Sequence, residues 1–355
     1  MRVVHLCRVG WPSIGGVERM VDGLSRYQVG QGHDVTVVTG RRMAGRRVDH
    51  AMREGVRYHR VHALGRGAYS VPWGLDRLLE GADVVHAHGL DGFTDLGVRL
   101  SRAPVGVSTH GGPLHTGKRR WLKALALRTR VRATASRADA VWYTSRADRR
   151  ALKMLNCPGS VVGNGLDLAP WLALPRQPEP GLWVVPGRIT PHKRVDAVLA
   201  VAARMPVTPT VAIVGVPQDA VYVGQLRQEA AESKVPVEWV TRATDAVLRT
   251  WVSRAEHVFF PSRYEGFGLG VVEAMAAGAS VWVSDIPAHR ERVRSGVEGQ
   301  VVDFDDQAAV ARALGDPSQP DTGPAARQAA AHYDWSVVGP QWERAYAHLL
   351  AKRTP

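Results

Sequence analysis

Short apolar runs alternate along the chain with segments whose apolar residues recur every three or four positions. Residues 3–6 and 35–38 have the pattern of short buried strands, and between them the apolar positions from Val17 to Tyr27 follow one helix face. A strand, a helix and a strand in this order favour a parallel, doubly wound sheet. Further strands are predicted at 56–61, 83–89, 105–112, 138–145 and 160–165.

The alternation stops at residues 170–180 and then resumes. This segment contains Pro170, Pro175, Pro178 and Pro180, which interrupt both helical and strand patterns, so we interpret it as a linker. Strands are predicted again at 182–185, 211–214 and 237–240, and a length of 355 residues favours two domains. We therefore expect an α/β protein with domains at 1–169 and 181–334 and a last helix within 335–355.

Composition narrows the possible partners and the location. The formal charge is +13 and the pI is near 10.3, which suggests an anionic partner such as a nucleotide, a membrane surface or an acidic substrate. No pattern typical of a nucleic-acid module accompanies the charge, so no nucleic acid is expected. Two isolated cysteines give neither a disulfide framework nor a zinc site. The N-terminus is too short and interrupted for a signal peptide, and no apolar segment approaches the ~20 residues that span a bilayer, so a cytoplasmic location is expected.

Residues 259–285 carry the densest candidate chemistry. A predicted strand ends at Phe260, and a loop containing Glu265 and Gly268 then leads into a helical pattern that includes Glu273. Backbone N–H groups at such a junction can bind an anion such as a diphosphate. On one helix the two carboxylates would lie about 80° apart, so both could face one cleft. Spacing alone favours a simpler interpretation, in which Glu265 caps the helix and Glu273 lies on its surface or at its buried edge.

Three other segments offer groups for a ligand. Arg188 and Lys193 follow the strand at 182–185, and an arginine fork with a lysine point charge suits a diphosphate, although solvated loop cations are the alternative. Gly15 and Gly16 precede the first helix without forming a dinucleotide fingerprint, and an ordinary tight turn is equally compatible. The acidic run 303–306 imitates a metal motif, but its place before a helix favours an N-cap, so no metal is expected.

Two predicted strands each deliver a histidine to their carboxyl end. His88 and His110 lie at the carboxyl ends of the strands predicted at 83–89 and 105–112, and open α/β sheets bind ligands at that edge. Taken singly, each histidine is more often a structural residue than a ligand-binding one. His86 is expected on the other side of its strand, with a structural role. The basic segment 118–132 fits either a core-facing helix or contact with an anionic membrane, and the core-facing helix is favoured.

The run EGFGLGVVEAMAAG, from Glu265 to Gly278, resembles the retaining nucleotide-sugar glycosyltransferases of glycosyltransferase family 4. The resemblance extends over nearly the full chain, through GGVE at 15–18, the histidine strand ends and GRITPHK at 187–193. It implies a GT-B fold, in which two facing Rossmann-like doubly wound domains enclose an interdomain cleft. The sequence departs from the family at Arg194 and Arg242, where many members have glycine, and the second departure bears on which base is bound.

The resemblance also implies roles for individual residues. His110, Arg188, Lys193 and Glu265 would be catalytic, Glu273 would bind the ribose, and Gly16, His88 and His110 would lie on the acceptor side. The donor would contact Gly15, Gly16, Arg188, Lys193, Arg242, Glu265, Gly266, Phe267, Gly268, Leu269 and Glu273.

The expected reaction moves a hexose or N-acetylhexosamine with retention from a nucleotide sugar, with UDP favoured, to a hydroxyl of a soluble small molecule or glycan. No cofactor or metal is expected. The alternatives are a membrane-associated enzyme of envelope lipid or polysaccharide synthesis that uses GDP-mannose and lies at the inner membrane face, and a catalytically idle nucleotide-sugar binder. A two-carboxylate glycosidase is disfavoured, because its carboxyl groups must flank the scissile bond.

Overall fold

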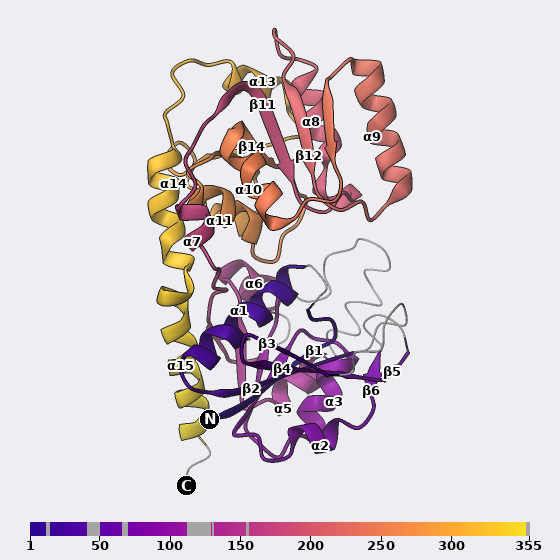
Figure 1. The fold of residues 1–355 in the computed structure, drawn as a ribbon, viewed down its shortest axis with the longest axis vertical. Coiled ribbons are helices and arrows are strands. Elements are labelled where there is room, and N and C mark those ends of the chain that lie inside the picture. The colour runs from indigo at the N-terminus through magenta and orange to yellow at the C-terminus, as the bar shows by residue number, and fades with distance from the viewer. Residues whose placement is uncertain are drawn as a thin grey trace. The chain divides into compact units, whose positions relative to one another are not determined.

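The computed structural model describes residues 1–11, 15–40, 50–65, 70–111, 129, 131–153 and 156–352. Two compact units emerge, one of Met1–Asp167 with Tyr333–Pro355 and the other of Leu168–His332 (Figure 1). Most of the basic segment 118–132 lies outside the described residues. Within the described part of the chain, no helix is long and apolar enough to cross a membrane.

The first unit is built on an eight-stranded sheet of order β10-β9-β8-β7-β1-β2-β4-β3. All neighbouring strands are parallel except β3, which runs antiparallel to β4. A separate hairpin pairs β5 with β6. The strands are β1 Arg2–Cys7, β2 Asp34–Gly40, β3 His50–Arg53, β4 Val56–Val61, β5 Ala63–Leu64, β6 Val71–Pro72, β7 Val84–His88, β8 Val105–Ser108, β9 Ala140–Tyr143 and β10 Ser160–Val161.

Helices pack on both faces of this sheet. Leu75 of α2 and Phe93 of α3 join one core cluster with strand residues such as Leu6. On the other face α1 packs with the C-terminal helix α15, whose Trp342 and Tyr346 are fully buried. The helices are α1 Gly16–Gly30, α2 Leu75–Leu79, α3 Gly92–Leu100, α5 Arg132–Arg137, α6 Arg146–Ala151 and α15 Trp335–Ala351.

The second unit contains a six-stranded sheet of order β13-β12-β11-β14-β15-β16, in which every pairing is parallel. Buried apolar residues run through the strand centres, as expected for a parallel sheet that is covered on both faces. Its strands are β11 Glu179–Pro186, β12 Thr210–Val214, β13 Val237–Val240, β14 Ala255–Phe260, β15 Ser280–Ser284 and β16 Gln300–Val302.

The helices of the second unit include three that share one core cluster, α8, α9 and α13, which contribute Val198, Leu226 and Val310. Figure 1 shows the unit as a sheet flanked by helices. Its helical segments are α7 Ala169–Leu172, η5 Pro191–Lys193, α8 Val195–Ala202, α9 Ala220–Ser233, α10 Asp245–Arg254, α11 Leu269–Ala276, α12 Pro287–Arg290, α13 Gln307–Leu314, α14 Gly323–Ala330 and η6 Ala331–Tyr333.

The segment expected to be a linker is partly regular structure. Helix α7 begins at Ala169 with Pro170 in its first turn, and β11 already begins at Glu179. Proline is tolerated in the first turn because its missing N–H would have no helical partner there. The residues without helix or strand are therefore fewer than the proline content suggested.

The strand order places a topological switch point in each sheet. In the first unit β1 lies between β2 and β7, and in the second unit β11 lies between β12 and β14. The chain winds away in opposite directions from such a central strand, which leaves a crevice at the carboxyl ends where open α/β sheets bind ligands. Candidate sites are therefore expected at the carboxyl ends of β1 and β7, and of β11 and β14.

Candidate active site

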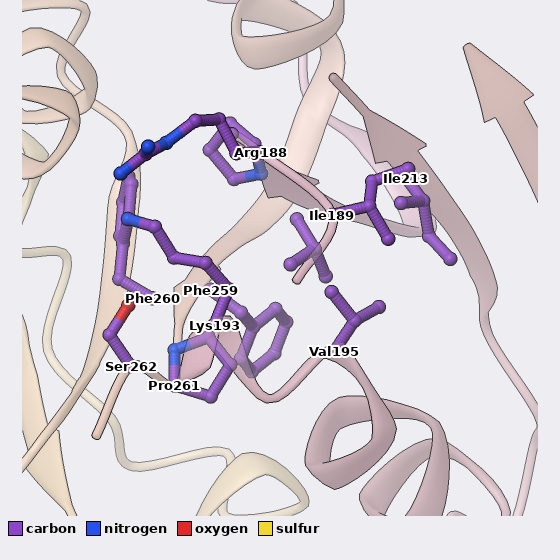
Figure 2. Close-up of a pocket in the computed structure, with 12 residues that line it drawn as sticks. Arg188, Ile189, Lys193, Val195, Ile213, Phe259, Phe260, Pro261 and Ser262 are labelled. Carbon is purple, nitrogen blue, oxygen red and sulfur yellow. The ribbon is translucent and has the colours of Figure 1, made fainter. Parts of the chain in front are cut away.

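A pocket occupies the switch point of the second unit. Its walls come from the residues that follow β11, among them Gly187 and Arg188, and from Pro261 and Ser262, which follow β14. Figure 2 shows the Arg188 and Lys193 side chains extending in the same direction, with Ile189, Val195 and Ile213 on the other side of the view. The pocket therefore combines two cationic side chains with an aliphatic wall.

Two glycines shape the loop that carries Arg188. Gly187 has φ +124°, a conformation that side chains disfavour. At Gly215, which follows β12, an added Cβ would lie only 1.6 Å from the carbonyl oxygen of Gly187. The loop after β11 can therefore lie against the end of β12 only because Gly215 has no side chain.

The two cations differ in their surroundings. Arg188 is exposed and forms no ion pair within the part of the chain that the structure describes. Lys193 is largely buried and forms an ion pair with Glu265, which also accepts a hydrogen bond from Ser262 Oγ at 2.8 Å. The backbone N–H of Arg263 donates to the carbonyl of His192 at 2.9 Å and joins the two loops. Arg188 is thus available to a ligand, whereas Lys193 is already positioned by a carboxylate.

Electrostatics keep Glu265 ionised. Burial by itself would raise the pKa of this carboxyl group, but the charge and hydrogen bond of Lys193 outweigh it, so the pKa is lowered. Nearby, burial lowers the pKa of His289 to about 4, so its ring is neutral at neutral pH. Its Nδ1–H donates to the Ser284 carbonyl at 2.9 Å, which leaves Nε2 as the bare nitrogen close to Gly268.

Helix α11 begins beside this cluster. Gly268 is its N-cap residue and has φ +86°, so the chain turns sharply just before the free N–H groups of the helix. Glu273 lies within α11 and is 8% exposed, which excludes the surface carboxylate of the simpler interpretation and agrees with its buried-edge form. Phe267 is buried, and the Arg292 guanidinium lies 3.8 Å from its ring centroid. Gly266 and Leu269, at the same turn, are half-buried.

The two residues that depart from the family pattern, Arg194 and Arg242, lie in different structural environments. Arg194 adopts φ +52°, the left-handed region where glycine is at no disadvantage, and its buried guanidinium pairs with Asp305. Arg242 is exposed in the loop after β13 and does not line the pocket. The Asp306 side chain accepts from the backbone N–H of Ala309 at 2.9 Å, which confirms that the acidic run caps α13.

In the first unit the predicted glycine turn lies at the start of α1. Gly15 is the N-cap residue, and the carboxylate of Glu18 occupies the space where a Cβ would lie. Gly16 is the first helical residue and is exposed. A side chain at position 15 would therefore displace Glu18 from the helix N-terminus.

Four histidines of the first unit, His5, His86, His88 and His110, form one cluster, and two expectations need correction. His88 is 2% exposed and lies between His5 and His110, so it supports His110 and does not line a surface. His86 shares its strand face with His88, at a ring-centroid distance of 3.9 Å, because residues two apart point to the same side. It bonds to Tyr346 Oη and Ser108 Oγ, both at 2.7 Å.

A metal is not needed to satisfy this cluster. The nitrogens of His5, His86 and His88 lie within 4.8 Å of one another, a spacing that three metal ligands could have. All six ring nitrogens, however, already have hydrogen-bond partners. The sequence-based expectation of no metal remains a prediction.

Sequence reasoning missed several residues of these clusters. Ser262 and His289 surround Glu265, while His5 and Gln28 extend the histidine cluster inward. His5 stood in a predicted strand without any local motif, and Gln28 on a predicted helix face. Their hydrogen-bond partners lie on other strands and helices of the first unit, so only the tertiary structure reveals them.

Comparison with known proteins finds glycosyltransferase relatives over nearly the whole chain. The family model described as Glycosyltransferase Family 4 matches residues 14–170, and that described as Glycosyl transferases group 1 matches residues 173–316. The GDP-mannose:cellobiosyl-diphosphopolyprenol alpha-mannosyltransferase of Xanthomonas oryzae pv. oryzae is 31% identical over 96% of this chain and 95% of its own. The enzyme of the same name from Komagataeibacter xylinus is 28% identical over 100% of this chain and 95% of its own.

Solved structures agree on the fold. Sucrose-phosphate synthase from Thermosynechococcus elongatus superposes with a TM-score of 0.81 at 21% identity, over 99% of this chain and 100% of that chain. The two Rossmann-like units thus have the GT-B fold that the sequence predicted. With its pocket at the β11 and β14 ends and its relatives matched over nearly their full length, the chain belongs to glycosyltransferase family 4 and is a glycosyltransferase.

Proposed function

We propose that the protein transfers a mannosyl group from GDP-mannose, with retention of configuration, to a hydroxyl group of a lipid-diphosphate-linked glycan. The part of this proposal that concerns the donor rests on the cationic pair Arg188 and Lys193, which lies beside the start of α11. A nucleoside diphosphate leaves with increasing negative charge, and positioned cations and helix N–H groups stabilise that charge.

The pocket residues suggest a division of labour. Arg188 has no ion pair among the described residues and can form two parallel bonds to phosphate oxygens. Lys193 supplies a point charge whose position Glu265 fixes. Glu265 is ionised and can accept hydrogen bonds from sugar hydroxyls, while Glu273 in α11 is assigned to the ribose by the family resemblance.

The full-length relatives favour the donor and the acceptor chosen here. Both mannosyltransferases named above use GDP-mannose and a diphosphopolyprenol acceptor, according to their names. GDP-mannose is an α-glycoside and their product is alpha, which supports retention. The sequence-based preference for UDP remains a prediction, and a soluble acceptor is the second choice. A lipid-linked acceptor would also bring the protein to a membrane surface, which co-sedimentation with anionic vesicles would test.

Binding and turnover together test the proposal. A thermal-shift screen should show a higher Tm with GDP and GDP-mannose than with UDP and UDP-glucose, since a ligand that binds the native state stabilises it. Incubation with GDP-mannose and a polyprenol-diphosphate glycan should release GDP and give an α-mannoside by NMR. GDP-mannose that binds without product from any acceptor would instead support an idle binder.

Two substitutions separate leaving-group stabilisation from folding. Arg188→Ala and Lys193→Ala should each lower kcat by about 100-fold or more, the usual loss for a group that stabilises developing charge. Arg312→Ala, at an exposed site in α13 outside the pocket, is the matched control and should retain activity. Near-normal turnover of either pocket variant at saturating donor would refute the assignment.

A further inference from the structure

Three histidines of the first unit, His5, His88 and His110, form with Gln28 a continuous hydrogen-bonded chain that ends at His110. Gln28 Oε1 on α1 lies 2.7 Å from His5 Nε2, and His5 Nδ1 on β1 lies 2.9 Å from His88 Nε2. His88 Nδ1, at the end of β7, lies 3.0 Å from His110 Nε2. Three neighbouring strand ends and one helix thus connect a buried amide to a residue at the ligand-binding edge of the sheet.

Every ring of this chain is neutral at neutral pH. Burial lowers the pKa of His5 to about 4, and the hydrogen bond that its ring donates to Gln28 opposes this only in part. Burial also lowers the pKa of His110 to about 4 and that of His88 well below its ordinary value. A neutral imidazole has one N–H donor and one lone pair, so each ring must receive a hydrogen bond at one nitrogen and donate at the other.

The amide oxygen of Gln28 can only accept, and this fixes the direction of the whole chain. His5 must carry its proton on Nε2 and accept at Nδ1 from the Nε2–H of His88. His88 in turn accepts at Nδ1 from the Nε2–H of His110. The remaining nitrogen, His110 Nδ1, is then a bare lone pair, and it has no partner within the described residues.

The backbone at His110, where the hydrogen-bonded chain ends, is also constrained. His110 has φ +47° and is followed by Gly111 at φ +82°. A non-glycine residue in the left-handed region costs about 1–2 kcal/mol and persists where the surroundings hold it. The bond to His88 is one such restraint, and it fixes both the position and the orientation of the His110 ring.

We propose that Gln28 is a positioning residue that acts through His5 and His88 to hold His110 in its Nε2–H tautomer. His110 then offers the Nδ1 lone pair as an acceptor for a hydroxyl group of the transferred hexosyl unit. The hydroxyl-contact half of this inference rests on the proposed function and on the catalytic role that the family resemblance implies for His110, whereas the tautomer half does not.

Nitrogen NMR tests the tautomer directly. In the full-length protein with 15N-labelled histidine, protonated and bare ring nitrogens have well-separated shifts in long-range 1H–15N spectra. His5, His88 and His110 should each show a protonated Nε2 and a bare Nδ1 at neutral pH. A protonated Nδ1 on His110 in the wild-type protein, which corresponds to the opposite orientation of the Gln28 amide, would overturn the proposal without any variant.

Two variants test the dependence on Gln28. Gln28→Leu removes the fixed acceptor at similar size, so His110 should show both tautomers. Ser108→Ala is the matched control, because it breaks only the neighbouring bond to His86 and should leave the His110 tautomer unchanged. An unchanged His110 spectrum in a folded Gln28→Leu protein would refute the relay.

Kinetics with modified donors tests the hydroxyl contact. Gln28→Leu should lower kcat/KM for GDP-mannose about tenfold, the usual effect of one hydrogen bond. One member of the series of 2-, 3-, 4- and 6-deoxy-GDP-mannose should show no further loss, because it already lacks the hydroxyl concerned. Equal losses for every analogue would mean that Gln28 is merely structural. Absence of turnover with wild-type protein would refute the proposed donor and leave the spectroscopic result standing.

Discussion

At the scale of single residues, Arg194 combines an unfavourable backbone conformation with a stabilising ion pair. Its φ of +52° is the conformation that glycine adopts freely, and many family members have glycine there. The arginine compensates with an ion pair to Asp305, and its own side chain is largely buried. The ion pair connects Arg194 to the loop that caps α13, because Asp305 belongs to that loop.

Two substitutions at this position separate backbone strain from the ion pair. Arg194→Ala keeps a Cβ at positive φ and loses the ion pair, whereas Arg194→Gly loses the ion pair and relieves the strain. The glycine variant should therefore be more stable than the alanine variant by about 1 kcal/mol. Urea unfolding of both proteins measures the difference, and an alanine variant as stable as the glycine variant would contradict the assigned strain.

At the scale of elements, the pocket lined by Arg188 and Lys193 depends on how closely two strand ends approach each other. Gly187 follows β11 and Gly215 follows β12, and the absence of a side chain at Gly215 lets the two backbones touch. Arg188 is the next residue in that loop, so its position follows from this contact. The glycines of this loop matter for packing as much as for turning.

Gly215→Ala should displace the loop that carries Arg188. The new Cβ would meet the Gly187 carbonyl at 1.6 Å, so the loop must move and binding of GDP should weaken with a loss of stability of about 1–3 kcal/mol. Gly224→Ala is the matched control, because position 224 lies within α9 and faces open space. That variant should gain up to about 1 kcal/mol. Calorimetric titration with GDP and urea unfolding give both quantities, and unchanged binding by Gly215→Ala would refute the packing argument.

At the scale of the whole molecule, the first unit is completed by the last helix of the chain. Trp342 and Tyr346 of α15 are fully buried against residues of β1, β9 and α1. The indole N–H of Trp342 also donates to the carbonyl of Gly163 at 3.1 Å. The first unit therefore cannot complete its core until the second unit has been synthesised.

Trp342→Ala should destabilise the first unit strongly. Removal of a fully buried tryptophan typically costs about 3–5 kcal/mol, here with the loss of a hydrogen bond in addition. Val337→Ala on the same helix is the control, since Val337 is 44% exposed, and its effect should stay within about 0.5 kcal/mol. Amide hydrogen exchange would show whether protection is lost in β1 and β9. Equal effects of the two substitutions would contradict the role of α15.

The buried histidines predict a loss of stability in mild acid. The pKa values of His5 and His110 are lowered to about 4 and those of His86 and His88 lie well below the ordinary value, so the unfolded chain binds more protons between about pH 4 and 6.5. Stability should therefore fall as pH falls through that window, by a few kcal/mol in all.

Unfolding free energies at several pH values from 7 to 5 test this expectation. The range lies above the lowered pKa of Glu265, so loss of the Lys193 ion pair adds little there. His348→Gln, at an exposed site of α15, should leave the pH slope unchanged, whereas His5→Gln should flatten it. A slope that is the same in wild type and His5→Gln would show that the cluster is not responsible.

The alternation of strand and helix patterns was sufficient to predict the α/β class and the parallel sheets, and the resemblance carried by the motif from Glu265 to Gly278 predicted the family. The motifs also selected Arg188, Lys193 and Glu265, which the structure brings to one pocket and one ion pair, while their roles toward a donor remain predictions. The sequence also placed His110 at the correct edge, since the carboxyl ends of parallel strands share one side of a sheet.

Tertiary structure alone decided which residues meet. The ion pair of Lys193 with Glu265 joins loops 72 residues apart, and the chain from Gln28 to His110 crosses three strands. Periodicity along one segment reports which face a residue occupies but not what lies opposite it. His88 was therefore expected at a surface, although its neighbours bury it. Sequence determined the elements and their ligand-bearing ends, and packing of strands distant in sequence determined the partners, burial and protonation of the groups that they carry.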